Sequence, residues 1–382
     1  MSEENTKIGA STRMGARRQR NEDALLIFTS AHRAVRVVCV FDGHGERGFE
    51  AADAARTAAG HFLDLHSAGC EGWSEDHWRL QLVQLFRDMH EAIRTRFLIP
   101  PADGAPLLSL SLSLLPSDRE DELFLDSLRT VRDGTGQPVR GGTTASVVVE
   151  VVASQTLITA NVGDSGVLLF GPSSSPTFLS EDHGPDNPEE FRRIERDFAH
   201  TPYRLRLVYT RYGRPQEEWP SIFEPDGTLR TLDTLVRAGL RDGLACDTAR
   251  NDLSSYAATP YLEESRLHDK TCISVTRALG NFYAHEFGLT CEPSVGVHAN
   301  LSTAAIVVAA SDGVWDAWAY DDLSAWLHAP ERAALSAQHL AEALVEASVR
   351  RASALFGSNG VDDTTAVVWR VRPRRRPTES VM

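Results

Sequence analysis

The chain is poor in lysine, and it lacks paired cysteines and long apolar runs. Its two lysines are Lys7 and Lys270, and neither lies in a glycine-rich phosphate-binding loop, which excludes a P-loop nucleotide hydrolase. The Cys-x5-Arg spacing, which forms the phosphate-binding loop of enzymes with a cysteine nucleophile, is absent as well. Two common ways of handling phosphate groups are therefore excluded.

The 5 cysteines form no Cys-x-x-Cys pair and no zinc-type spacing with histidine, which predicts reduced, mostly buried thiols in an intracellular protein. The start of the chain, Met1–Gly9, is polar, and no apolar run approaches the roughly 18 residues that a membrane span needs. We therefore expect no membrane contact and a cytoplasmic location. The basic stretch Arg370–Arg376 leaves the nucleus open, although a solvated terminus is its simpler interpretation.

The charge balance is acidic, with Lys+Arg 39 against Asp+Glu 53 and a net charge of -14. Such a balance disfavours a nucleic-acid partner and leaves room for a carboxylate-rich metal site. The 382 residues suggest about two domains by length alone, and the 42% hydrophobic content is enough for a sizeable core. The partner is therefore expected to be a cation rather than a polyanion.

Apolar periodicity predicts a series of strands and helices. The expected strands cover Val35–Phe41, Thr143–Val152, Thr156–Phe170, Ala304–Ala310 and Thr364–Val371, with a strand or hairpin over Ile8–Phe28. The expected helices cover residues 46–65, a segment after Ser74, the region around Asp321–His328, and Ser336–Phe356. The strand Val35–Phe41 is expected to break sharply at Asp42-Gly43-His44-Gly45, where glycine permits a tight turn.

Two segments lack this apolar periodicity and are predicted to be insertions. The first, at about 100–140, contains the Ser/Leu alternation Leu107–Leu115, which is typical of either an edge strand or a low-complexity loop. The second, Arg192–Lys270, is rich in Pro, Gly, Arg and Tyr and is expected to form an irregular, enlarged flap.

Short acidic motifs follow or lie inside several of the apolar runs. Carboxylates at the ends of buried strands can converge although they are far apart in the sequence. The motifs are Asn21-Glu22-Asp23, Phe41-Asp42-Gly43-His44-Gly45, Asn161-Val162-Gly163-Asp164-Ser165, Ser311-Asp312-Gly313-Val314-Trp315-Asp316 and Val361-Asp362-Asp363-Thr364-Thr365. A division into two domains would separate these carboxylates from one another. We therefore predict one domain over residues 8–371, with flexible termini at 1–7 and 372–382.

In their order along the chain, these motifs resemble the metal-dependent serine/threonine protein phosphatases of type 2C, the PPM family. The resemblance also rests on Arg18-Gln19-Arg20, Gly141-Gly142-Thr143-Thr144-Ala145, Asp182-His183-Gly184-Pro185 and Val275-Thr276-Arg277-Ala278-Leu279-Gly280. It implies an α+β fold: a central antiparallel β-sandwich flanked on both faces by antiparallel helix pairs, which makes four layers (αββα). It also implies phosphorylated proteins as substrates, and we expect a monomer that acts in signalling.

The residues themselves favour metal-assisted hydrolysis of phosphate esters. Two metals about 3.5–4 Å apart can lower the pKa of a bridging water, so that hydroxide attacks the phosphoryl group, and can neutralise the charge on its oxygens. Carboxylate, carbonyl and water ligands suit Mg²⁺ or Mn²⁺, and no Cys/His cluster favours zinc.

The resemblance assigns metal ligands position by position. It implies that Asp42 bridges two metals and that the Gly43 carbonyl, Asp312 and Asp362 complete the first site. Glu22, with Asp23 as a further candidate, is implied for the second site. A third, weaker metal is implied for Asp164 with the Asp312 motif, in which Asp316 is a further candidate.

An arginine and a histidine complete the implied site. Arg18 matches the arginine that binds the substrate phosphate, with Arg17 or Arg20 as alternatives if the local register differs. His44 matches the general acid that protonates the leaving alkoxide, although a histidine in a glycine turn can also be merely exposed.

The sequence departs from the family at three positions: Asn281 and Asp363 replace the usual aspartate and asparagine, and Glu46 replaces a glycine. Asn281 removes a negative charge near the flap, and the long Arg192–Lys270 segment leaves substrate selectivity open. The expected function is hydrolysis of phosphoserine and phosphothreonine. The alternatives are a catalytically weak regulatory or binding module and a hydrolase of small phosphate esters.

Overall fold

The computed structural model describes residues 7–98, 130–131, 138–172, 175–211, 214–219, 221–230, 253–259, 272–298 and 304–371. Residue 7 apart, the predicted flexible termini lie outside these residues, as do the Leu107–Leu115 run and most of the predicted insertion at 100–140. Within the described part, no helix is both long and apolar enough to span a membrane.

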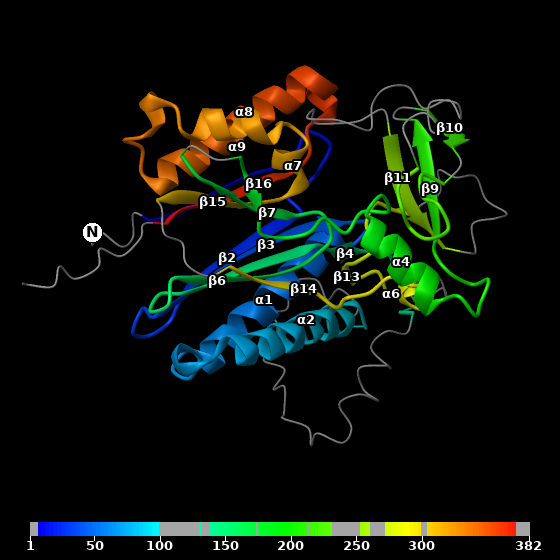
Figure 1. Cartoon of the computed structure of the whole chain (residues 1–382), viewed down its shortest axis with the longest axis horizontal. Helices are drawn as coiled ribbons and strands as arrows, with labels where there is room; N and C mark the ends of the chain where they lie inside the picture. Colours follow the sequence, from blue (N-terminus) through cyan, green and yellow to red (C-terminus); the bar gives the residue numbers. More distant parts are fainter. Residues whose placement is uncertain are drawn as a thin grey trace, which may run out of the picture.

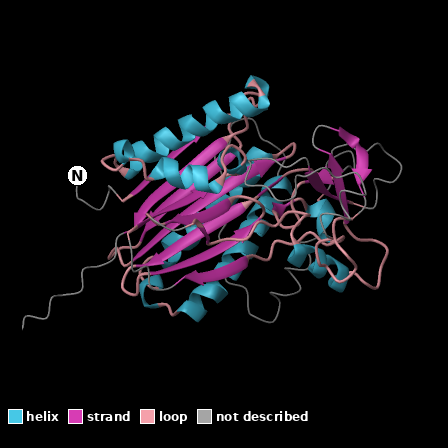
Figure 2. Ribbon diagram, turned by 45° about the horizontal axis from the view of Figure 1, so that its top comes forward, coloured by secondary structure: helices cyan, strands magenta, loops and turns pink. Residues whose placement is uncertain are grey.

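Two antiparallel sheets form the centre of the molecule (Figure 2). The first has 7 strands in the order β13-β4-β3-β5-β6-β14, with β2 paired to β3. These strands are β2 (Asp23–Thr29), β3 (Val35–His44), β4 (Gly142–Thr143), β5 (Ala145–Val151), β6 (Thr156–Val162), β13 (Leu279–Gly280) and β14 (Ser294–His298).

The second sheet has 5 strands in the order β1-β16-β15-β7-β8. They are β1 (Ile8–Arg13), β7 (Gly166–Phe170), β8 (Thr177–Phe178), β15 (Ala305–Ala310) and β16 (Thr364–Val371). The predicted run Thr156–Phe170 therefore supplies strands to both sheets, because β6 belongs to the first and β7 to the second.

A helix pair covers the outer face of each sheet, so the molecule has four layers (Figure 1). The first sheet is covered by α1 (Gly48–His66) and α2 (Glu75–Leu98), and the second by α8 (Tyr320–Leu327) and α9 (Ala337–Phe356). The predicted α+β sandwich is confirmed. All four helices lie where the sequence predicts them, and the Ser336 hydroxyl caps α9 by accepting a 3.1 Å hydrogen bond from the His339 amide.

The apolar sequence of β3 follows from burial on both of its faces. Val37 and Phe41 pack toward α1 and α2, whereas Val38 and Val40 pack between the sheets with residues such as Trp369 of β16. Because successive strand residues point to opposite faces, a strand in a middle layer must be apolar at nearly every position. Packing on both faces therefore fixes the position of β3 and of the residues at its end.

Two sequence expectations are wrong. Ile8–Phe28 forms no hairpin, because β1 pairs with β16 and β2 pairs with β3, in different sheets. The strand predicted over Val35–Phe41 does not break after Phe41: β3 continues to His44, since Gly43 and His44 pair with Thr143 and Gly142 of β4. The functional motif therefore lies on a strand rather than in a loop.

The segment expected to be an irregular flap contains regular structure where it is described. Its first residues belong to α4 (Pro188–Asp197), and its strands join β12, just after Lys270, in a 4-stranded sheet in the order β10-β9-β11-β12. The strands are β9 (Arg206–Arg211), β10 (Arg214–Trp219), β11 (Leu253–Ala258) and β12 (Cys272–Ile273), and they stand at one end of the sandwich (Figure 1). Ile194 of α4 packs against Leu205 and Ala257, so this region has its own apolar cluster.

A buried carboxylate ties α4 to the segment before β13. Glu190, which is 0% exposed, accepts hydrogen bonds from Arg193 (2.8 Å), Arg277 (2.6 Å) and the Thr276 hydroxyl (2.7 Å). Burial alone would raise the pKa of Glu190, but the two arginines outweigh it and lower the pKa from 4.5 to about 2. The ionised carboxylate therefore stabilises the folded chain at neutral pH.

We predict that Glu190→Gln lowers the free energy of unfolding by about 3 kcal/mol at pH 7, because it leaves buried arginine donors without their anion. Since folding depresses this pKa, the difference from wild type is fully present above the unfolded pKa and is lost as pH falls from 4.5 toward about 2. Urea denaturation measures both. Glu189→Gln, on an exposed pair with Arg192, is the matched control and should cost less than about 1 kcal/mol; equal effects of the two variants would contradict the prediction.

Candidate active site

Carboxylates from both sheets meet at one end of the sandwich. Asp23 begins β2 and stands opposite Asp42 of β3 in the strand register. Asp164 lies in the turn between β6 and β7, Asp312 begins α7 (Asp312–Trp315) just after β15, and Asp362 precedes β16. The fold thus brings the predicted carboxylates to neighbouring strand ends.

The electrostatic environment of Asp42 indicates how closely these groups approach one another. Burial raises the pKa of Asp42 well above its usual value, and the charges of Asp312, Asp23, Asp164 and Asp362 raise it further. Burial and neighbouring carboxylates also raise the pKa of Asp312. Because such effects weaken with distance, Asp42 of one sheet and Asp312 after β15 of the other lie within electrostatic reach of each other.

Asp23 is held from the opposite sheet. The Ser311 hydroxyl donates a 2.8 Å hydrogen bond to Oδ2 of Asp23. The other carboxylate oxygen, Oδ1, is buried and has no hydrogen-bond partner among the residues that the structure describes. Burial raises the pKa of Asp23 to about 7, against the opposing effect of hydrogen bonds from Thr365 and Ser311. A buried acceptor without a donor suits a cation or its bound water.

Only glycine fits at position 43. A Cβ atom there would lie 2.4 Å from the Gly48 carbonyl oxygen and 2.6 Å from the Glu22 carbonyl oxygen. The Gly43 amide donates a 3.2 Å hydrogen bond to that Glu22 carbonyl. The missing side chain therefore lets β3, the start of α1 and the Glu22 segment approach one another beside Asp42.

Arg18 lies among the predicted metal ligands. Its Nη1 donates a 2.7 Å hydrogen bond to Glu22, and its Nη2 lies 3.5 Å from a carboxylate oxygen of Asp362. Arg17 and Arg20 are exposed and pair with no carboxylate in the part of the chain that the structure describes. The geometry therefore favours Arg18 over these two alternatives as the arginine of the pocket, while its phosphate-binding role stays a prediction.

His44 pairs with Asn281, one of the positions at which the sequence departs from the family. The Asn281 amide nitrogen lies 2.6 Å from Nε2 of His44 and donates to it. Burial, together with the charge of Arg18, lowers the pKa of His44 to about 4, against the opposing effect of a hydrogen bond to the backbone of Asp42. The ring is therefore neutral at pH 7, and its predicted role as a general acid requires an anionic substrate to raise its pKa.

Asp363 holds the N-terminal segment in the pocket. Its Oδ1 accepts a 2.6 Å hydrogen bond from the Gly15 amide, and its Oδ2 accepts a 2.7 Å hydrogen bond from the Glu22 amide. The sequence marks this position only as a departure from the family. A side chain with two accepting oxygens explains why aspartate, rather than asparagine, suits this arrangement.

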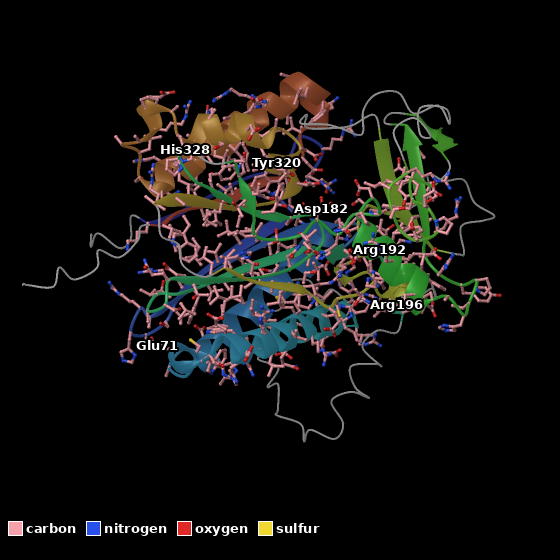
Figure 3. The ribbon with its side chains drawn as sticks, viewed as in Figure 1. Glu71, Asp182, Arg192, Arg196, Tyr320 and His328 are labelled. Atoms are coloured by element: carbon pink, nitrogen blue, oxygen red, sulfur yellow. The ribbon has the colours of Figure 1, made fainter. Side chains whose placement is uncertain are left out.

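Two further carboxylates, Asp182 and Asp186, were not predicted as part of the site, and they interact with the predicted Asp164 and with Asp316. Burial, followed by the charges of Asp316 and Asp186, raises the pKa of Asp164 to about 6. Asp182 has its pKa raised by desolvation and then by Asp164, Asp186 and Asp316. Figure 3 shows Asp182 where the sandwich meets the α4 region, not far from Tyr320. The motif Asp182-His183-Gly184-Pro185 was the available signal, but it suggested no role.

The donor chemistry of the pocket fits a hard divalent cation. Its ligand groups are carboxylate oxygens whose mutual repulsion a cation would relieve, and Oδ1 of Asp23 is an orphaned buried acceptor. Among the residues that the structure describes, however, no three His, Cys, Asp or Glu side chains are already arranged as a coordination shell. The residues thus fit Mg²⁺ or Mn²⁺ in kind, and the choice of ligands stays a prediction.

A family model described as Protein phosphatase 2C matches residues 106–200 and 257–354, about half of the chain. The chain belongs to this family. "Probable protein phosphatase 2C 6" of Paramecium tetraurelia is 27% identical over 187 residues, which cover 49% of this chain and 52% of the relative. "Probable protein phosphatase 2C 8" of Oryza sativa subsp. japonica is 34% identical over 151 residues, which cover 34% of this chain and 35% of the relative.

The chain spans about half the length of the Paramecium protein and less of the rice protein. Solved structures show the same fold over nearly the whole chain. Serine-threonine phosphatase 2C from Toxoplasma gondii has a TM-score of 0.53 and 16% identity, covering 95% of this chain and 94% of its own. A C. elegans sex determining protein has a TM-score of 0.56 and 17% identity, covering 96% of this chain and 65% of its own.

We predict that Asp363→Asn lowers the free energy of unfolding by about 1–3 kcal/mol, because an amide NH₂ would face the Gly15 or Glu22 amide, leaving a buried donor unpaired. Chemical denaturation measures the loss. Asp322→Asn is a matched control, since Asp322 is exposed and contacts Arg351 at 3.5 Å. If Asp363→Asn were as stable as wild type, the role of Asp363 in holding the Gly15 and Glu22 amides would be contradicted.

Proposed function

We propose that this chain is a metal-dependent protein phosphatase that hydrolyses phosphoserine and phosphothreonine in proteins. The observation that carries the proposal is the electrostatic interaction of Asp42 on the first sheet with Asp312 after β15 of the second and with Asp362, which Arg18 contacts at 3.5 Å. Family membership supports phosphatase chemistry, and the oxygen donors support a hard cation. The acidic pocket and the arginine together suit a phosphate monoester bound through cations.

Mg²⁺ or Mn²⁺ bound in this pocket would supply an activated water and neutralise charge on the phosphoryl oxygens. We propose two cations and a third, weaker one. The proposed ligands are Asp42, the Gly43 carbonyl, Asp312 and Asp362 for the first cation, Glu22 and Asp23 for the second, and Asp164 with Asp312 for the third.

The chain's own side chains then bind the substrate and move protons. The guanidinium of Arg18, already at the edge of the pocket, binds two phosphate oxygens through its planar N–H fork. Glu22 orients Arg18 through their 2.7 Å contact. His44 gives a proton to the leaving serine or threonine oxygen once the phosphate has raised the pKa of the ring, which requires Nε2 to leave its contact with the Asn281 amide nitrogen.

The proposal extends to partners and location. The substrates are phosphorylated proteins in signalling, and the net charge of -14 argues against nucleic acid. We propose a monomer without membrane association, formed by one domain over residues 8–371, in the cytoplasm or, alternatively, the nucleus.

We predict that the purified chain releases phosphate from phosphoserine peptides with Mg²⁺ or Mn²⁺ and not with a chelator. Asp312→Asn should lower kcat/KM at least about 100-fold, because it removes a carboxylate that is proposed to bind two of the cations. Asp322→Asn, an exposed aspartate of α8, is the control and should retain wild-type kinetics.

Two results would contradict this proposal. A folded wild-type protein that releases no phosphate under any metal condition, yet binds a protein partner tightly, would be a regulatory module instead. A clear preference in kcat/KM for small phosphate esters over phosphoproteins would assign the site to small-molecule hydrolysis.

A further inference from the structure

Arg20 is an exposed arginine held in position by an aromatic ring. Its guanidinium carbon lies 4.0 Å from the ring centroid of Phe49, in the first turn of α1. It makes no hydrogen bond and no ion pair with any residue that the structure describes. A cation over an aromatic face is stabilised there, while the N–H groups at its edge stay available to a ligand.

This arginine stands on the same side of the pocket as Arg18. Phe49 follows Gly48, and a Cβ atom at Gly48 would lie 3.1 Å from Oε2 of Glu22. That same oxygen accepts the 2.7 Å hydrogen bond from Arg18.

The spacing suits a bound peptide. Two residues of chain span at most about 7 Å, so the backbones at Arg18 and Arg20 are about as far apart as neighbouring or next-neighbouring residues of an extended peptide. A peptide whose phosphate is bound by Arg18 would therefore carry an adjacent side chain past Arg20.

We propose that Arg20 forms a second anion subsite, which binds an acidic or phosphorylated side chain one or two residues from the phosphoserine. The inference rests on the proposed phosphatase function and names a substrate class for it. In a chain with a net charge of -14, Arg18 is paired with Glu22 and Arg47 with Glu50. Arg20 is instead both positioned and available, which is what a recognition residue needs.

The test compares three phosphoserine peptides that have alanine, glutamate or a second phosphoserine beside the target residue. With the full chain and Mn²⁺, kcat/KM should be roughly 3- to 10-fold higher for each anionic neighbour than for alanine, and the ratio should fall as salt is added. The glutamate and phosphoserine arms distinguish a carboxylate from a phosphate as the preferred ligand.

Three variants locate the effect. Arg20→Gln should bring the ratio of anionic to alanine peptide close to one. Phe49→Leu keeps the charge but removes its support, so the ratio should fall part of the way. Arg17→Gln is the matched control, since Arg17 is equally exposed but has no aromatic contact in the described part of the chain, and it should keep the wild-type ratio.

Several outcomes would overturn the inference. If wild type hydrolysed anionic and alanine peptides with equal kcat/KM, or if Arg20→Gln left their ratio unchanged, Arg20 would not bind a neighbouring anion. An equal loss for all three peptides in Arg20→Gln would instead make Arg20 the residue that binds the target phosphate. If no peptide is hydrolysed, the proposed function fails, and the affinities of the three peptides for wild type and Arg20→Gln, measured by fluorescence anisotropy, decide the subsite separately.

Discussion

Repulsion among carboxylates in a crowded pocket is the constraint on which the rest of this structure depends. The two sheets end at the same place, so Asp42 and Asp312 are held close to each other and to Asp23, Asp164 and Asp362. Like charges in a desolvated site are costly unless they are protonated or bind a cation. The rigid sandwich imposes this cost, because β3, which carries Asp42, and β15, which leads to Asp312, are buried on both faces.

The surrounding contacts maintain that arrangement. Asp363 holds the segment before β2 through two backbone amides, Ser311 holds Asp23 from the other sheet, and the missing side chain at Gly43 lets three segments meet. None of these groups needs to touch a substrate. They fix the positions of the groups that do, and an active site requires such fixed positions if its charges are to act on a phosphate.

The sequence predicts much of this from local patterns. The periodicity of Ser336–Phe356 and the apolar run of β3 determine their elements, and the acidic motifs identify the carboxylates at the strand ends. The failures are non-local. That β1 and β2 belong to different sheets depends on pairing with β16 and β3, and β3 extends to His44 only because β4 lies beside it. Likewise, Asp182 joins Asp164 through tertiary folding, which no single motif reveals.

The stability of Asp42→Asn at pH 7, measured by denaturant unfolding in chelator and in Mn²⁺, tests this constraint most directly. Folding raises the pKa of Asp42, so its carboxyl group destabilises the folded state above the unfolded pKa. The variant should therefore be more stable than wild type in chelator, whereas Mn²⁺ should stabilise wild type and leave the variant nearly unchanged. A variant that is less stable than wild type in chelator, or a wild type that Mn²⁺ does not stabilise, would contradict the account.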